Sequence, residues 1–266
     1  MRLIITSRGV GRWAANYVMK KMKAVGATDE RNFILGLPTG GTAVELYRHL
    51  VASYKKGDVS FKNVTTFNMD EYIGLPEDHP ESYHTYMREN LFSQVDMDPA
   101  KINIPNGNAP DLAAECRDYD QRMADCGGVD LFLGGVGENG HIAFNEPYSS
   151  LMSSTRDKQL DVNTRLANSR FFGGDISQVP KSALTVGVKG LLDAREVLIM
   201  ITGAKKALAL CQCMEGAVSQ AWPITALQLH PKAIIVADEE ACGELKVKTY
   251  RYFKELQDEF SYIDEL

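Results

Sequence analysis

Two short segments of the sequence carry side chains suited to proton transfer. In the first, residues 64–69 form a predicted buried strand that is followed directly by the carboxylates Asp70 and Glu71. A carboxylate at a strand end, close to a bound anion, is well placed to abstract a proton beside a carbonyl or an imine. The alternative is structural, because either carboxylate could cap the helix that follows. The residue types leave both readings open.

The second segment is a glycine-rich loop after the predicted strand at residues 131–133, and it contains Asn139, His141 and Glu146. A histidine titrates near neutral pH, and a nearby carboxylate suits it to moving protons onto and off hydroxyl groups. A lone histidine is often structural, but one in a polar loop beyond a strand end is more often functional. We therefore expect His141 and Glu146 to take part in proton transfer.

The same loop has the spacing G-x-G-x-x-G at Gly135, Gly137 and Gly140, which is typical of dinucleotide-binding sites. That motif opens a long helix, whereas Pro147 follows within a few residues here and would break one. We therefore reject a dinucleotide site and expect no cofactor. We also find no H-E-x-x-H motif and no Cys/His spacing typical of zinc, so no metal site is expected.

An anion site is predicted where the strand at residues 33–37 runs through Gly40 and Gly41 into a helix that begins near Thr42. Glycines let backbone N–H groups approach a ligand, and a helix start adds unpaired donors and a positive dipole. The Gly-Lys-[Ser/Thr] ending of a nucleotide-binding P-loop is absent, so a single phosphate is the better fit. An ordinary strand–helix turn with a Thr cap is the alternative.

Basic side chains that could face an anion occur in three places. Arg170 precedes a Gly-Gly turn, and Lys206 follows the predicted strand at residues 197–201 near another helix start. A lysine there would reinforce the helix dipole at a phosphate. Arg156 and Lys158, in a predicted loop at residues 153–158, form a second small basic cluster. All four could instead be solvated surface.

Composition limits the partners and the compartment. The chain has 266 residues and a formal net charge of −6, so it has no bulk attraction for nucleic acid or for anionic membranes. No apolar run approaches the roughly 18–20 residues that span a bilayer. The start of the chain lacks the apolar core of a signal peptide, and the five cysteines are scattered, as is typical of reduced thiols. A cytoplasmic location is therefore expected.

Short apolar runs alternate with amphipathic stretches along the chain. Strands are predicted at residues 3–5, 33–37, 64–69, 131–133, 183–186, 197–201 and 233–236. Helices are predicted near residues 12–25, 43–54, 82–92, 111–124, 205–217 and 245–260. Strands rich in Ile, Leu and Val that alternate with helices predict a single α/β domain over residues 1–266, with a mostly parallel sheet covered on both faces. Ligands of such sheets bind outside the carboxyl ends of the strands, where the polar loops fall.

Several long motifs resemble the glucosamine-6-phosphate deaminase family. They are LGLPTGGT at residues 35–42, FNMDEY at 67–72, GHIAFNEP at 140–147 and ANSRFF at 167–172, and the likeness runs along the whole chain. The resemblance implies a modified doubly wound, Rossmann-like α/β fold related to phosphogluconolactonases. It also implies conversion of glucosamine 6-phosphate and water to fructose 6-phosphate and ammonia.

The resemblance also implies roles for individual residues. His141 with Glu146 would open the pyranose ring, and Asp70 would take the C2 proton. Asn139 stands where many relatives have an acidic residue, so we expect it to orient the histidine ring while Glu146 supplies the charge. The substrate phosphate would be held by the following residues: Gly40, Gly41, Thr42, Arg170 and Lys206.

Some members of this family are hexamers activated by N-acetylglucosamine 6-phosphate at a subunit interface. The residues that match such an effector site are Ser149, Ser150, Arg156, Lys158 and Tyr252. Arg156 and Lys158 would bind the effector phosphate, which favours an allosteric homo-oligomer. Ser154 argues against it, because a regulated relative has another basic residue there.

Two other functions compete with this reading. A 6-phosphogluconolactonase would use a phosphate cradle and a loop histidine, but it needs no base at C2. A sugar-phosphate sensor would normally carry a DNA-binding domain, for which this chain has neither the length nor the basic charge.

Overall fold

The sheet at the centre of the chain contains several strands that are almost entirely apolar. The computed structural model describes residues 1–28 and 31–257. Val197–Ile201 and Ala233–Ala237 are buried along their whole length, as expected for strands covered on both faces. They pair in parallel with five others in the order β1-β10-β9-β6-β2-β3-β5. The bounds are β1 (Arg2–Ile5), β2 (Phe33–Leu37), β3 (Val64–Asn68), β5 (Ile102–Asn103), β6 (Leu131–Gly135), β9 (Val197–Ile201) and β10 (Ala233–Ala237).

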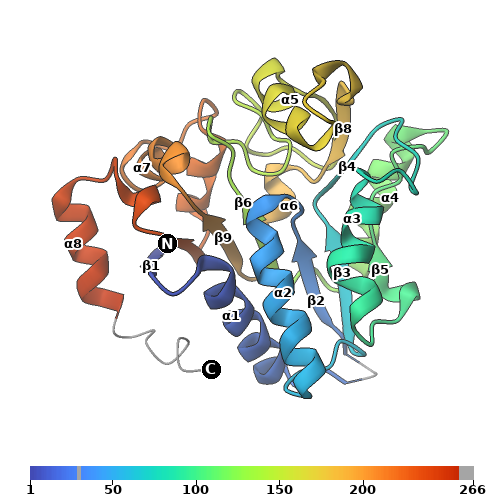
Figure 1. Cartoon of the computed structure of the whole chain (residues 1–266), viewed down its shortest axis with the longest axis horizontal. Coiled ribbons are helices and arrows are strands. Elements are labelled where there is room, and N and C mark those ends of the chain that lie inside the picture. Colours follow the sequence, from blue (N-terminus) through green and yellow to red (C-terminus); the bar gives the residue numbers. More distant parts are fainter. Residues whose placement is uncertain (29–30, 258–266) are drawn as a thin grey trace.

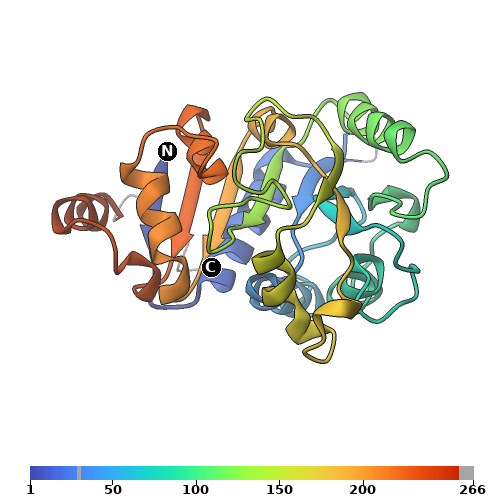
Figure 2. The same ribbon diagram turned by 90° about the horizontal axis from the view of Figure 1, so that it is seen from above.

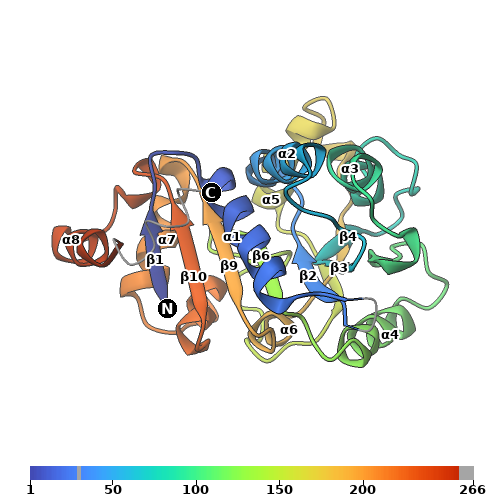
Figure 3. The same cartoon turned by 90° about the horizontal axis from the view of Figure 1, so that it is seen from below.

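Helices cover both faces of this sheet (Figure 1; Figure 3). On β9, Leu198 and Met200 join one apolar core, while Ile199 and Ile201 join a second core on the opposite face. The first core lies under α1 (Val10–Val25), α2 (Gly41–Lys56) and α3 (Tyr83–Asn90). The second lies under α4 (Leu112–Asp125), α6 (Val188–Leu192) and α7 (Ala207–Glu215). The predicted α/β class, with a mostly parallel sheet between two helical layers, is confirmed.

A small antiparallel sheet stands beside the parallel one, in the order β4-β8-β7. Its strands are β4 (Asp70–Tyr72), β7 (Arg156–Gln159) and β8 (Ser182–Thr185). The strand predicted at residues 183–186 is therefore present, but it lies outside the parallel sheet. The change of sheet begins at Met69, whose carbonyl accepts the N–H of Val186 at 2.8 Å. From this point the chain after β3 leaves the main sheet and pairs with β8.

The predicted loop at residues 153–158 is wrong in its second half, because β7 begins at Arg156. This strand has the sequence RDKQ, whose half-buried and exposed side chains alternate without an apolar residue, so hydrophobicity could not reveal it. It is an edge strand, and edge strands tolerate such polar sequences.

The last described helix, α8 (Val247–Leu256), packs against β1 at one edge of the main sheet. A helix was predicted near residues 245–260, and residues 258–260 lie outside the described part of the chain. The remaining elements are short. They are α5 (Val162–Asn168) and the 3₁₀ turns Phe92–Gln94, Pro99–Lys101, Ser169–Phe171, Ile176–Gln178, Ala204–Lys206, Pro223–Leu229 and Glu240–Cys242.

Candidate active site

Four neighbouring strands bring the predicted site residues to one edge of the sheet. β9, β6, β2 and β3 are adjacent and parallel, so their carboxyl ends meet at the same edge, at the top of Figure 1. Thr42 follows β2, Asp70 follows β3, His141 follows β6 and Lys206 follows β9. Seen from above in Figure 2, the loops that follow β6 and the segment around α5 lie over this edge. Sheet topology alone therefore gathers residues that are far apart in sequence.

The start of α2 is open to a ligand. Gly40 occupies the N-cap with φ of 89°, in the left-handed region that favours glycine, and no side chain caps the first turn. A Cβ added to Gly40 or Gly41 would meet no other atom within 4 Å. The Tyr86 hydroxyl donates to the Gly40 carbonyl at 2.8 Å and fixes the turn. The free N–H groups and the dipole of a 16-residue helix thus point at accessible space, which suits an anion.

Two cations of the predicted phosphate site, Lys206 and Arg170, lie close to each other. Burial lowers the pKa of Lys206, the negative charge of Glu138 opposes this, and the charge of Arg170 lowers the pKa further. Arg170, on the turn Ser169–Phe171, is therefore close enough to repel the Lys206 ammonium. Like charges held together in this way are stabilised by a bound anion.

Asp70 is a buried carboxyl, with a relative exposure of 6%. Burial, together with the charge of Glu71, raises its pKa to about 8. Its surroundings are aromatic, because its charge raises the pKa values of the buried tyrosines Tyr47, Tyr72 and Tyr119 and of the half-buried Tyr83. A carboxyl that holds its proton near neutral pH is a stronger base than an exposed one.

His141, Asn139 and Glu146 form a connected group. His141 Nδ1 lies 2.7 Å from Asn139 Oδ1, and Asn139 Nδ2 donates to Glu146 Oε2 at 3.0 Å. An amide oxygen can only accept, so in this network Nδ1 of His141 carries the proton and Nε2 of the neutral ring is free to accept one. Glu146 Oε2 is also 3.5 Å from Nδ1, within range of an ion pair if the ring is protonated.

The charge of this group resides on Glu146, which is 5% exposed. Burial alone would raise the pKa of Glu146, but the hydrogen bond and charge of His141 and the hydrogen bonds of Thr164 and Asn139 lower it to about 2. Glu146 is therefore ionised throughout the physiological range. A permanent carboxylate beside a histidine stabilises the protonated ring.

The fold joins this loop to the strand that carries Asp70. The Phe144 ring packs against the Tyr72 ring with centroids 5.7 Å apart, and Tyr83 stacks on Phe144 at 6.3 Å. These rings belong to a small apolar cluster separate from the two main cores. Because Tyr72 and Asp70 lie on the same short strand, the cluster holds the histidine loop against β4.

Comparison with known proteins identifies the family. A family model described as Glucosamine-6-phosphate isomerases/6-phosphogluconolactonase matches residues 6–236. The chain belongs to this family.

Named relatives in the glucosamine-6-phosphate isomerase/6-phosphogluconolactonase family are similar over nearly their whole length. The glucosamine-6-phosphate deaminase of Parabacteroides distasonis is 60% identical over 97% of this chain and 96% of its own. That of Serratia proteamaculans is 58% identical over 94% of each chain.

Solved structures of the family agree with the fold. A monomeric glucosamine-6-phosphate deaminase is 40% identical, with a TM-score of 0.86 over 91% of this chain and 99% of its own. The 6-phosphogluconolactonase of Thermotoga maritima has a TM-score of 0.73 over 90% of this chain and 99% of its own, but it is 16% identical. The second likeness shows the shared fold alone.

The residues that we expect to form an effector site lie on three parts of the fold. Ser149 is 3% exposed and its hydroxyl has no hydrogen-bond partner among the described residues. Arg156 on β7 donates to Asn145 Oδ1 at 2.9 Å, and Lys158 lies two residues further along the same strand. Ser150 accepts the N–H of Met152 at 3.2 Å. Tyr252 is on α8, which packs on β1 at the far edge of the main sheet.

Two residues that support the site, Asn145 and Asp238, gave no sequence signal, and a third, Glu71, was open to two interpretations. Asn145 donates to the carbonyls of Ile142 and Val186 and thereby ties the histidine loop to β8. Asp238 accepts the N–H of Gly203 with both oxygens, at 2.9 and 3.1 Å, which fixes the loop before Lys206. Glu71 binds the first turn of α3, so the helix-cap alternative applies to this residue.

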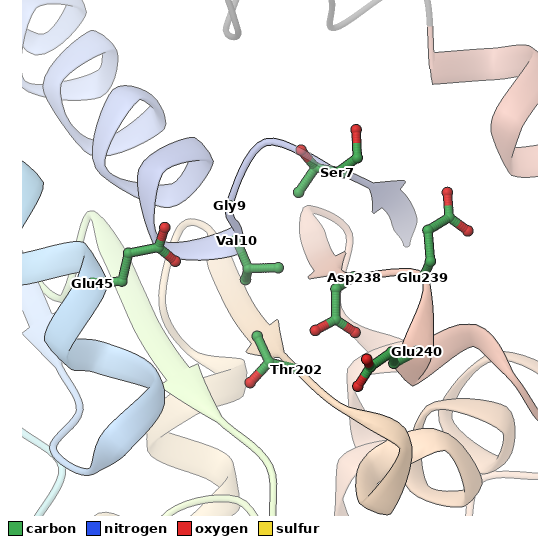
Figure 4. Close-up of a pocket in the computed structure, with 9 residues that line it drawn as sticks. Ser7, Gly9, Val10, Glu45, Thr202, Asp238, Glu239 and Glu240 are labelled. Carbon is green, nitrogen blue, oxygen red and sulfur yellow. The ribbon is translucent and has the colours of Figure 1, made fainter.

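An acidic hollow of about 360 Å³ lies beside the candidate active site (Figure 4). It opens at the carboxyl ends of β1, β9 and β10 and is lined by four carboxylates, those of Glu45, Asp238, Glu239 and Glu240. Glu45 accepts the N–H of Gly11, and Glu239 pairs with Lys254 at 2.7 Å. The hollow repels anions, so it does not hold a phosphate.

Two negative findings concern the described residues alone. Residues 1–28 and 31–257 contain no group of three or more His, Cys, Asp or Glu side chains placed to hold a metal ion. In the same ranges, none of the helices combines the length and apolar character needed to cross a membrane.

Proposed function

We propose that this chain is a glucosamine-6-phosphate deaminase, which converts glucosamine 6-phosphate and water to fructose 6-phosphate and ammonia. The observation that carries the proposal is the buried Asp70 at the end of β3, held beside a loop in which His141, Asn139 and Glu146 are hydrogen-bonded. Relatives 57–60% identical to the chain bear this name. Lactone hydrolysis removes no proton from C2, so a buried base favours the deaminase.

The reaction begins with ring opening. His141 Nε2 takes the proton of the C1 hydroxyl and returns a proton to the ring oxygen, which gives the open-chain aldehyde. Glu146 stabilises the imidazolium that exists between these two transfers, since its carboxylate is 3.5 Å from Nδ1. Asn139 keeps Nδ1 as the donor, and therefore keeps Nε2 directed to the substrate side.

Asp70 carries out the second stage. Its carboxylate removes the C2 proton, and the C–H electrons form the C1=C2 bond of an enolamine. The π electrons of the C1 carbonyl move to its oxygen, which takes up a proton. Reprotonation at C1 gives a ketimine, water adds to C2, and ammonia leaves. The substrate amino group is a cation at neutral pH, and its charge lowers the raised pKa of Asp70 when it binds. Binding thus ionises the base at the moment it is needed.

The phosphate anchors the substrate at the other end. We assign it to the N–H groups of Gly40 and Gly41, the Thr42 hydroxyl and the cations Arg170 and Lys206. The uncapped start of α2 and the repulsion between the two cations support this assignment. Fixing the phosphate and the proton-transfer groups at neighbouring strand ends positions C1 and C2 between them.

A coupled ammonia assay on glucosamine 6-phosphate tests this function. We expect ammonia release by the unmodified chain and a loss of at least about 1000-fold in kcat for Asp70→Asn, since the amide cannot accept the proton. An unmodified, folded chain that releases no ammonia from glucosamine 6-phosphate overturns the proposal. The same assay with 6-phosphogluconolactone, followed by acid release, measures the competing activity.

Regulation and assembly form a separate proposal. N-acetylglucosamine 6-phosphate would bind Ser149, Ser150, Arg156 and Lys158, with Tyr252 supplied by a neighbouring copy of a hexamer in the cytoplasm. Two observations support it: the buried Ser149 hydroxyl has no hydrogen-bond partner within the described part of the chain, and Arg156 bonds to Asn145, which directly precedes Glu146. The separation of α8 from β7 within one chain means that Tyr252 could join this site only between copies.

Two measurements test this regulation. Light scattering gives the mass of the assembly, and we expect about six times that of one chain. Substrate-saturation curves should be sigmoidal and become hyperbolic with the acetylated sugar phosphate. A monomer with hyperbolic kinetics contradicts the proposal, and a monomeric state has a precedent in the solved deaminase that is 40% identical to this chain.

A further inference from the structure

Glu71 is a buried carboxylate that the proposed reaction does not use. It is 2% exposed and follows Asp70 on β4. Its oxygens accept the backbone N–H groups of Tyr72, Tyr83 and His84 at 2.7–3.2 Å. Two of these donors belong to the first turn of α3, whose own cap, Ser82, serves the N–H of Thr85 instead. Glu71 therefore completes the capping of α3 from a neighbouring strand.

This arrangement couples the position of Asp70 to α3, one of the helices that cover the main sheet. Consecutive strand residues point to opposite faces, so anchoring the side chain of Glu71 at α3 directs that of Asp70 to the other face. β4 has only three residues and pairs with one strand, β8. The hydrogen bonds from the Tyr83 and His84 N–H groups of α3 to Glu71 thus add a second anchor to a strand that backbone pairing alone holds weakly.

The two carboxyls also interact through charge. Burial raises the pKa of Glu71 to about 7, although its three backbone donors lower it. Burial raises the pKa of Asp70 to about 8, and the charge of Glu71 adds to this. Asp70 therefore loses its proton less readily when the adjacent Glu71 carries a negative charge.

We propose that Glu71 is a positioning residue for Asp70, which anchors β4 to α3 and makes the adjacent carboxylate a stronger base. This inference rests on the proposed deaminase function for its kinetic consequences, but the electrostatic part stands on the two side chains alone.

The other groups that face this pair are four tyrosine hydroxyls, one exposed carboxylate and one histidine. Asp70 is surrounded by the hydroxyls of Tyr47 on α2, Tyr72 on β4, Tyr83 on α3 and Tyr119 on α4. Glu71 is faced by the exposed residue Glu77 and by His84. The Nε2 atom of His84 lies 3.9 Å from Glu71 Oε2. That nitrogen is buried and has no hydrogen-bond partner among the described residues.

The test compares Glu71→Gln with the control Glu77→Gln. Glu71→Gln removes the charge and presents an amide N–H₂ to backbone donors, so we expect kcat to fall by about 10- to 100-fold with KM within about twofold. The acid limb of kcat/KM should move to lower pH by about one unit, because a neighbouring negative charge has been lost. Glu77→Gln should leave both the rate and the limb unchanged.

A second variant and a direct titration keep the test decisive if Glu71→Gln does not fold. His84→Arg places a permanent cation near the Glu71 carboxylate and should also move the acid limb to lower pH. The Asp70 carboxyl is titrated by ¹³C NMR in protein labelled at aspartate, with Asp70→Asn to assign the signal. That titration should shift to lower pH in either variant.

The outcomes separate the inference from the proposed function. If no protein releases ammonia but the Asp70 titration still moves, the function fails and the electrostatic inference holds. A drop in kcat by the same factor at every pH, with an unmoved Asp70 titration in both Glu71→Gln and His84→Arg, reduces Glu71 to a structural cap and overturns the inference.

Discussion

Thr185 is the cross-strand partner of Asp70 in the small sheet, and its hydroxyl accepts the backbone N–H of Phe144 at 3.0 Å. Phe144 lies between His141 and Glu146 in the histidine loop. One residue of β8 therefore contacts both halves of the proton-transfer machinery. The relative position of the candidate base and the candidate acid–base histidine depends on a strand that lies outside the main sheet.

The first prediction concerns Glu146, because Asn139 cannot supply charge to His141. In Glu146→Gln the imidazolium loses a carboxylate 3.5 Å away, so ring opening should slow and kcat should fall by about 100-fold. The pH–rate profile should change as well, since the Glu146 carboxylate no longer stabilises the protonated ring. Steady-state kinetics from pH 5 to 10 measure both effects.

The exposed residue Glu138 provides a control in the same loop. Glu138→Gln leaves the hydrogen bonds of His141 intact, so the pH profile of its kcat should match that of the unmodified chain. An unchanged kcat and pH profile in Glu146→Gln would show that the role assigned to Glu146 is wrong.

The second prediction follows from the burial of Asp70 and concerns stability. The pKa of this carboxyl rises from 3.8 to about 8 in the folded chain, so folding favours its protonated form. The protonated Asp70 carboxyl therefore contributes to the free energy of unfolding fully below about pH 4, and this contribution is lost as the pH rises towards about 8. The Asp70→Asn variant has no ionisable group at position 70. The difference between its free energy of unfolding and that of the unmodified chain should therefore increase as the pH rises across this window.

Urea unfolding at several pH values measures that difference. It should grow by at most about 1.4 kcal/mol per pH unit, the limit for one proton, and level off above pH 8. A difference that is constant from pH 4.5 to 9 would mean that Asp70 titrates normally. The same variant should lack activity, so that one substitution gains stability and loses function.

Much of this site followed from the sequence because its residues lie in loops after apolar strands. Asp70, His141 and Lys206 were assigned to strand ends, and the parallel order of β3, β6 and β9 brings those ends to one edge. Helix starts were equally visible, since Gly40 precedes an amphipathic stretch. Local pattern and sheet topology are sufficient for these features.

The second sheet and the supporting contacts could not be predicted in this way. β7 is polar, β4 has three residues, and neither produces a periodic signal. The bonds of Asn145 to Val186 and of Asp238 to Gly203 join residues 41 and 35 positions apart. Such contacts depend on the relative placement of elements, which a single sequence does not encode locally.

The third prediction tests the phosphate site through Lys206. Lys206→Met keeps much of the apolar stem but removes the cation, so KM for glucosamine 6-phosphate should rise by about 10- to 100-fold, the range for one charge-assisted hydrogen bond. The value of kcat should change much less, because the phosphate is remote from C1 and C2. Lys205→Met is the control, since Lys205 is the exposed neighbour on the same turn.

Inorganic phosphate provides an independent readout of the same site. It should inhibit the unmodified chain competitively and inhibit Lys206→Met at least about tenfold more weakly. Equal inhibition of the two proteins, together with an unchanged KM, would exclude Lys206 from the phosphate site.

The last prediction uses two glycines of the histidine loop that differ in surroundings. A Cβ at Gly137 would lie 2.1–2.5 Å from three atoms of the His141 ring, so the ring has to move. A Cβ at Gly135 would meet only the Met200 carbonyl, at 3.9 Å, which is an ordinary contact. Gly137→Ala should therefore lower kcat by about 100-fold, whereas Gly135→Ala should retain most of the activity.

Stability measurements show whether the effect of Gly137→Ala is local. The His141 side chain is 20% exposed, so its ring can swing towards solvent, and the free energy of unfolding should change by about 1 kcal/mol or less. KM should stay within about twofold, because the phosphate residues lie on other loops. Equal activity of the two glycine variants would mean that the ring position set by Asn139 and Glu146 does not limit the reaction.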